Sequence, residues 1–350
     1  MSVNPIKTDV LVVGGGPAGL AAAIAARLKG FDVVVADAAR PPIDKACGEG
    51  LFPDSIAALG RLGIAIRPEH GFPIRGIRFL GDGASTEASF PSGPGLGMRR
   101  TGLHQLLADR ATELGVTLRW GTPVAETSDV SCRWIVAADG QHSRVRLAAG
   151  LDGARRKSRR FGFRRHYQIA PWTDYVEVHW GPGLQVYVTP IARDEVCVAL
   201  LCRNPHLRLD DALPHFEQLR RRLQGVAYSS AERGAVTRSR RLRRVYRGST
   251  ILIGDASGSV DAITGEGLCL SFRQAIALAD ALRSGDLAAY QKEHRRIFRR
   301  PMLMGDLMLS LDRYPLLRRP VLRALAFKPA IFAKLLAVHV GLPLPAVVEP

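Results

Sequence analysis

The chain has 350 residues, of which 47% are apolar, so it can bury a large core in one domain with an insertion or in two domains. Its five cysteines form no CxxC pair, which argues against a disulfide framework or a zinc site and favours a reducing compartment. No run of about 18 apolar residues is free of charge, so we expect no membrane-spanning helix. The first apolar stretch is interrupted by glycines and a proline, so we do not expect it to be a signal peptide. We therefore expect a cytoplasmic protein without a metal site.

The formal net charge of +17 allows three interpretations. A solvated, arginine-rich surface is the plainest. Nucleic acid would need a basic stripe, and arginines do cluster at 155–165 and 238–247. An anionic membrane surface would also attract such a chain. We favour the solvated surface and predict no nucleic-acid partner.

The stretch Thr8–Asp37 organises the chain. An apolar, β-branched run is followed by Gly14-Gly15-Gly16-Pro17-Ala18-Gly19, then by an alanine-rich helical segment and a second strand that ends at Asp37. Glycines at this spacing let backbone N–H groups approach a pyrophosphate, which the helix N-terminus then faces. Asp37 is placed to accept hydrogen bonds from a ribose. The alternative is a glycine-rich turn before a packed helix.

The segment Cys47-Gly48-Glu49-Gly50 follows a polar loop and can lie against a flat ligand. Cys47 is either a small buried residue or a thiol close to a ligand. Residues 51–62 predict a short helix.

Two strands are predicted at 74–80 and 84–90, and Arg99 and Arg100 precede a helical period that begins at Leu103. A further strand at 133–138 ends in Asp139-Gly140, where a carboxylate can contact a hydroxyl-bearing ligand.

In the middle of the chain, apolar and polar residues alternate as they do in the strands of an antiparallel sheet. Strands are predicted at 175–180, 185–190 and 195–201, with an amphipathic helix at 206–223. We therefore expect an inserted sheet that is distinct from the dinucleotide core.

The predicted dinucleotide core continues after this insertion, with a strand at 250–253 and the turn Gly254-Asp255. A second glycine turn, Thr264-Gly265-Glu266-Gly267, leads into a helix that begins at Leu268. The positive end of that helix would stabilise negative charge on a ring or phosphate that faces it.

Residues 286–350 are helical, basic and apolar, and prolines at 301, 315, 320 and 329 predict short helical pieces. One interpretation is a cap that packs on the domain. The other is a lid or a membrane-surface patch that admits a lipid substrate.

Taken together, the glycine turn with Asp37, Asp139-Gly140 and Gly254-Asp255 resemble the FAD-binding fold of the glutathione-reductase type. The branch is the one that holds geranylgeranyl reductases and para-hydroxybenzoate hydroxylase-like monooxygenases. The resemblance implies an α/β fold: a Rossmann-like FAD-binding domain (1–70, 96–150 and 248–285), an inserted antiparallel-sheet substrate domain (71–95 and 151–247) and a helical C-terminal cap (286–350).

The resemblance also implies roles for single residues. Gly14, Gly16 and Gly19, with Pro17 and Ala18, would hold the pyrophosphate, and Asp37 the adenosine ribose. Arg100 and Asp139 would reach the FAD. Gly254 and Asp255 would bind its ribityl or phosphate part. Gly265, Gly267 and Leu268 would present the helix N-terminus to the isoalloxazine.

The implied activity is FAD-dependent oxidation–reduction of a hydrophobic small molecule. Thr264–Gly267 and Cys47–Gly50 resemble the geranylgeranyl reductase set, and the histidine that the hydroxylases carry after Gly-Asp-Ala is absent. We expect hydride reduction of a C=C bond in an isoprenoid-like or polyketide-like molecule, with NAD(P)H as transient reductant and Cys47, Glu49 or Glu266 as proton donor.

The alternatives are an FAD-dependent monooxygenase and, outside enzymes, a prenyl-binding protein on the same fold. The basic and apolar C-terminal region also allows peripheral membrane contact.

Overall fold

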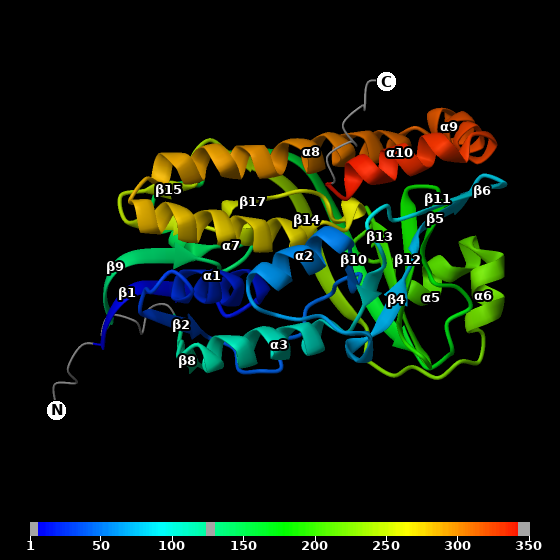
Figure 1. The fold of residues 1–350 in the computed structure, drawn as a ribbon. Helices are drawn as coiled ribbons and strands as arrows, with labels where there is room; N and C mark the ends of the chain where they lie inside the picture. The colour runs from blue at the N-terminus through cyan, green and yellow to red at the C-terminus, as the bar shows by residue number, and fades with distance from the viewer. Residues whose placement is uncertain (1–5, 124–129, 342–350) are drawn as a thin grey trace, which may run out of the picture.

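A computed structural model describes residues 6–123 and 130–341. Its elements confirm the predicted α/β architecture with a helical C-terminal region (Figure 1).

The first unit is a six-stranded sheet in the order β15-β16-β9-β1-β2-β8. β1 (Ile6–Val13) lies between β2 (Val33–Asp37) and β9 (Val130–Ala137), and both neighbours run parallel to it. The buried valines of these strands explain why they occupy the centre, because a parallel sheet is covered on both faces. The remaining strands of this sheet are β8 (Thr117–Trp120), β15 (Tyr246–Arg247) and β16 (Thr250–Leu252).

Three helices pack beside this sheet. α1 (Pro17–Arg27) contacts both α3 (Arg100–Glu113) and α7 (Gly267–Ser284). Their apolar sides share one core, in which Leu20, Ile24 and Phe272 are fully buried. α2 (Pro53–Arg61) contacts α7, and the short α4 (Arg144–Ala148) follows β9. β1 and β16 both run parallel to β9, so the turns that follow these two strands lie at the same end of the sheet.

The second unit is an eight-stranded sheet in the order β17-β14-β10-β13-β12-β11-β5-β6. Its pairs are antiparallel except β11 with β5, so residues 76–89 join the sheet formed by the middle of the chain. Its strands are β5 (Gly76–Gly81), β6 (Ala84–Ser89), β10 (Ala154–Tyr167), β11 (Tyr175–Gly181), β12 (Leu184–Ala192), β13 (Glu195–Cys202), β14 (Arg233–Leu242) and β17 (Gly258–Ser259). A three-stranded sheet joins the units: β3 (Gly50–Leu51), β4 (Phe72–Ile74) and β7 (Gly95–Gly97).

The helix predicted at 206–223 is broken. The structure has α5 (Leu209–Ala212), a single 3₁₀ turn (Leu213–His215) and α6 (Glu217–Leu223). Pro214 lies within the 3₁₀ turn, where its ring and missing N–H prevent a continuous α-helix.

The C-terminal region consists of α8 (Leu287–Arg313), α9 (Pro315–Phe327) and α10 (Pro329–His339), which lie along one outer side of the molecule (Figure 1). The prediction that four prolines divide this region into short helices was correct for Pro315 and Pro329 and wrong for Pro301 and Pro320. Pro315 and Pro329 each begin a helix, where no N–H is needed. Pro301 and Pro320 lie inside helices, because burial of neighbours such as Ile297 and Leu322 offsets the lost hydrogen bond.

No helix among the described residues combines the length and the apolarity that crossing a bilayer requires.

Candidate active site

The turn between β1 and α1 is shaped by glycines that serve different purposes. Gly14 has a φ of +107°, a conformation that side chains disfavour. A Cβ on Gly19 would lie 1.8 Å from the Gly14 carbonyl oxygen, so this glycine permits close packing of helix and strand. A Cβ on Gly16 would meet no protein atom within 4 Å and would project into open space. That space is where a ligand could approach the backbone.

The Asp37 carboxylate fixes this turn. Its Oδ2 accepts a hydrogen bond from Gly15 N–H at 2.6 Å, and its Oδ1 accepts one from Ala39 N–H at 2.7 Å. The buried His104 donates from Nε2 to the Gly15 carbonyl at 2.9 Å, and burial lowers its pKa. Sequence reasoning missed His104, because its place in the helical period gives no sign of a polar partner.

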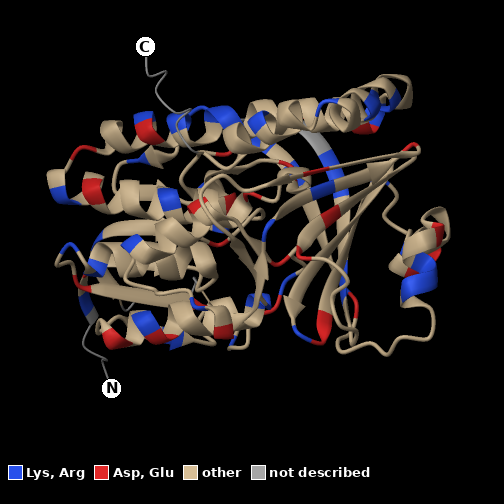
Figure 2. Cartoon of the chain, turned by 45° about the vertical axis from the view of Figure 1, so that its right-hand side comes forward, with Lys and Arg blue, Asp and Glu red and all other residues tan. Residues whose placement is uncertain are grey.

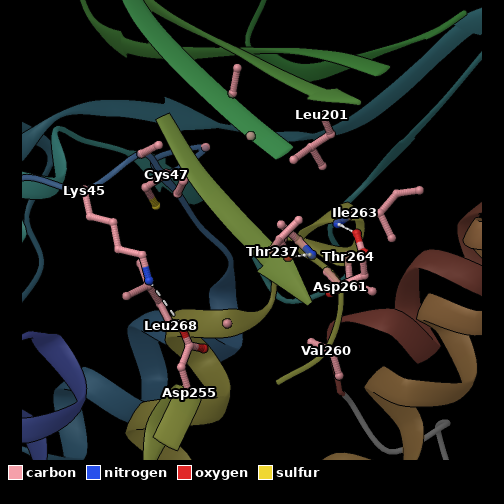
Figure 3. A pocket seen from close by; sticks show the side chains of 18 of the residues that line it. Lys45, Cys47, Leu201, Thr237, Asp255, Val260, Asp261, Ile263, Thr264 and Leu268 are labelled. Atoms are coloured by element: carbon pink, nitrogen blue, oxygen red, sulfur yellow. Dashed lines mark hydrogen bonds and ion pairs between the residues drawn. The ribbon is translucent and has the colours of Figure 1, made fainter. Parts of the chain in front are cut away.

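The turn that follows β16, Gly254-Asp255, lies across the same space. Gly254 has a φ of +59°, and its N–H donates to Gln274 Oε1 at 2.7 Å. The next residue, Asp255, forms an ion pair with Lys45 at 3.2 Å (Figure 3). Lys45 was not singled out from the sequence, because a lysine in a polar loop is usually solvated.

The N-terminus of α7 opens on the same space. Gly265 adopts a left-handed conformation with a φ of +71°, and a Cβ on Gly267 would meet no atom within 4 Å. An 18-residue helix therefore presents its unpaired first N–H groups to the cavity. Such an end stabilises an anion or a ring that gains negative charge.

Five polar side chains that line the cavity have a buried atom without a hydrogen-bond partner among the described residues: Arg100, Asp139, Gln141, Arg164 and His339. Of these, Arg100 and Asp139 were predicted to reach the cofactor. Asp139 accepts hydrogen bonds from the N–H groups of Arg144 and Val145 through Oδ2, but its buried Oδ1 has none. Arg100 Nε is also buried and unpaired. Buried polar atoms are rarely left unsatisfied, so a bound ligand is the natural partner of both.

The cavity has a volume of about 1130 Å³. That exceeds the range of about 300–1,000 Å³ that is usual for a single ligand. Most residues predicted to hold the cofactor line it: Gly14, Gly16, Pro17, Ala18, Asp37, Arg100, Asp139, Asp255, Gly265, Gly267 and Leu268. Gly19 and Gly254 do not line it but shape its two turns. Its size leaves room for a second molecule beside a dinucleotide.

The rest of the cavity is an apolar lobe between the eight-stranded sheet and α8–α10. The sheet contributes Phe79 and Val178, and the helices contribute Met308 and Leu336. Figure 3 shows Leu201 and Ile263 facing this part of the cavity. A ligand here would contact almost only hydrocarbon, so the lobe suits a hydrophobic molecule.

Glu49, one of the three predicted proton donors, lines the cavity and belongs to a buried polar network. Its Oε1 accepts from Arg100 N–H at 3.0 Å, and its Oε2 lies 2.6 Å from Nε2 of His166. The Arg164 guanidinium lies 3.9 Å from Glu49 and pairs with Asp44. Glu49 has a φ of 59°, which is rare outside glycine and typical of a functional constraint.

The network continues away from the cavity. Nδ1 of His166 lies 2.7 Å from Ser230 Oγ and 3.2 Å from Arg164, whose guanidinium can only donate. Nδ1 therefore accepts, and the imidazole proton lies on Nε2, directed at Glu49. His166, Arg164 and Ser230 were missed from the sequence.

The other two candidates differ in position. Cys47 lines the cavity, and its sulfur accepts a hydrogen bond from Glu49 N–H at 3.4 Å. Glu266 is buried, does not line the cavity and lies 3.7 Å from Arg300 and 3.5 Å from His339. Burial raises the pKa of Glu266 to about 8.

The solvated interpretation of the arginine cluster fails for part of it. Arg160 and Arg164 are each 1% exposed, and Arg160 pairs with Asp261. Both face inward because alternate residues of β10 point to the same face of the sheet. The period of two was the signal that could have found them.

The residues present fit FAD: one glycine turn is open for a pyrophosphate, the predicted cofactor ligands Arg100 and Asp139 have buried atoms without partners, and a helix N-terminus faces the cavity. The family described as "FAD binding domain" matches residues 7–180. Digeranylgeranylglycerophospholipid reductase 1 of Methanopyrus kandleri is 28% identical over 75% of this chain and 77% of its own.

A solved flavoprotein/dehydrogenase from Cytophaga hutchinsonii has the same fold, with a TM-score of 0.79 over 95% of this chain and 92% of its own at 17% identity. The menaquinone reductase of Mycobacterium tuberculosis (strain H37Rv) is 31% identical over 82% of this chain and 79% of its own. The chain therefore belongs to the superfamily of FAD-dependent oxidoreductases that includes the menaquinone reductases.

Proposed function

We propose that this oxidoreductase reduces a C=C bond in a hydrophobic, isoprenoid-bearing molecule such as a prenylated quinone, with NAD(P)H as transient reductant. The observation that carries the proposal is the apolar lobe, which continues directly from the cofactor end of the cavity. The substrates named for the two reductases above both carry isoprenoid chains, which favours the same class here.

Bound FAD supplies hydride chemistry, and the protein supplies the surroundings. The turns at Gly14–Gly19 and Gly254–Asp255 would hold its phosphates and ribityl chain. The α7 N-terminus would stabilise the negative charge of the reduced ring. The apolar lobe would hold the isoprenoid chain and exclude water from the reacting double bond.

Reduction of a C=C bond also needs a proton, and Glu49 is the best-placed donor. Its carboxylate lies at the cavity and accepts a hydrogen bond from His166 Nε2–H at 2.6 Å. Ser230 lies at the other imidazole nitrogen, Nδ1, through which the pair would take up one further proton. Glu49 would then give one proton to the substrate, and the pair would return to a neutral imidazole beside a carboxylate. Cys47 is the rival donor because it lines the same cavity.

The described residues hold one glycine turn of the dinucleotide type, and both strand–turn–helix units open on one cavity. A nicotinamide donor would therefore bind only transiently, at the face of the bound cofactor.

The test is an anaerobic assay of the purified holoprotein with menaquinone and either NADPH or NADH. We expect a product heavier by two hydrogen atoms, formed without oxygen. A product that gains an oxygen atom and forms only in air would overturn the proposal and favour a monooxygenase.

A further inference from the structure

Exposed apolar side chains concentrate on the C-terminal helices. Eight of the eleven large hydrophobic side chains exposed in the described part of the chain lie between residues 303 and 335. Leu316 is 88% exposed and Phe327 is 83% exposed, which is unusual for such side chains on a soluble surface. The eight are Leu303, Leu307, Tyr314, Leu316, Leu317, Phe327, Ile331 and Leu335.

These side chains follow the helical period. Leu303 and Leu307 are one turn apart on α8, as are Ile331 and Leu335 on α10. α9 contacts both α8 and α10, and the three helices lie along the same outer side (Figure 1). We call the exposed residues 299–335 the outer face.

The outer face is also strongly basic. Six exposed cations belong to it: Arg299, Arg313, Arg319, Arg323, Lys328 and Lys334. Of the two carboxylates within residues 299–335, Asp306 is exposed and belongs to the outer face, whereas Asp312 is buried and pairs with Arg203. Figure 2 shows basic residues along these helices. Cations around an apolar surface complement a membrane with anionic headgroups.

The apolar lobe of the cavity borders this face. Leu307, Leu317 and Leu335 are between 36% and 46% exposed, yet all three also line the cavity. They come from α8, α9 and α10, one from each helix. A hydrophobic molecule could therefore pass between the three helices without crossing water, provided that the outer face lies on lipid.

We propose that the outer face docks on an anionic lipid bilayer, with α8, α9 and α10 in the interface and the cavity mouth toward the acyl chains. A second copy of the chain would fit the outer face less well than a bilayer does. A two-fold contact would place the same six cations against each other, and like charges disfavour such an interface. Docking needs no turnover, so it can be tested apart from the proposed reaction.

The test is cosedimentation of the FAD-loaded full chain with vesicles of phosphatidylcholine alone or mixed with phosphatidylglycerol. We expect binding to the mixed vesicles, weakened by salt, and little binding to the neutral ones. Leu316→Glu with Phe327→Glu should lower the partition coefficient about tenfold or more. Each of Arg323→Gln and Lys328→Gln should lower it about fivefold.

The matched controls are Leu147→Glu and Arg61→Gln, which change exposed residues on α4 and α2. Both should bind the mixed vesicles as the unaltered protein does. Flavin absorbance and a thermal melt confirm that each variant is folded. Equal binding by the Leu316/Phe327 variant, no binding to mixed vesicles, or a dimer that the same double substitution dissociates would each overturn the proposal.

Discussion

The Glu49 carboxylate lies 2.6 Å from Nε2 of His166, although the two residues are 117 positions apart and come from a loop and from β10. Both are buried, and the imidazole is held from its other side by Ser230 and Arg164. A buried acid paired with an oriented histidine at a cavity can store and deliver a proton. We therefore expect Glu49→Gln to lower kcat by about 10²–10⁴-fold while flavin absorbance is kept.

A substitution at His166 tests whether the imidazole takes part in proton delivery. His166→Gln keeps a polar group near Glu49 but cannot relay a proton, so it should lower kcat while flavin absorbance is kept. Cys47→Ser is the comparison for the rival donor. If Cys47→Ser removes activity while Glu49→Gln retains it, the proton comes from the thiol.

Gly16 provides a sharp test of the cofactor site. A Cβ there would meet no protein atom within 4 Å, and its φ of −69° suits alanine. Gly16→Ala should thus fold normally yet bind FAD at least about tenfold more weakly, because the methyl group fills the approach to the backbone. Gly60→Ala on α2 is the matched control, since a Cβ there is also unobstructed. Titration of the apoprotein with FAD compares them, and equal affinities would contradict the placement of the pyrophosphate.

The features that were predictable from the sequence are local. The buried run Val10–Val13, the glycine turn and Asp37 lie within 30 residues, so strand, turn and helix signals reinforce each other. Gly254-Asp255 repeats this pattern next to another buried strand. Each element is specified by its own side chains and its own backbone needs.

The unpredictable features depend on sheet register. His166 reaches Glu49 only because β10 pairs with β13 and β14 in one particular alignment. A shift of one residue would turn His166 to the other face of the sheet. The apolar lobe is likewise invisible in the sequence, since its lining joins α8–α10 to strands more than 100 residues away.

The apolar lobe predicts a dependence on substrate length. Val178 on β11 is 2% exposed and lines the lobe. Val178→Phe should narrow it and lower kcat/KM for a long-chain quinone about tenfold or more. A quinone with a single short prenyl unit keeps a C=C bond but needs little of the lobe, so its kcat/KM should change little. Equal losses for both quinones would show that the substitution disturbs the fold instead.

Glu266 predicts how stability depends on pH. Burial raises its pKa to about 8, whereas an unfolded glutamate titrates near its model value of 4.5. Between these values the folded state holds a proton that the unfolded state has lost. Glu266 therefore lowers stability as pH rises, by about 1.4 kcal/mol per pH unit, until the folded group also ionises.

Glu266→Gln removes this titration while keeping a neutral side chain of similar shape beside His339. The variant should match the unaltered protein in denaturant unfolding at pH 5 and be more stable at pH 8, by about 2–4 kcal/mol. Glu69→Gln is the control, because Glu69 is exposed and carries only a surface ion pair with Arg67. A variant that loses stability equally at both pH values would show that Glu266 is ionised in the folded protein and held by Arg300 instead.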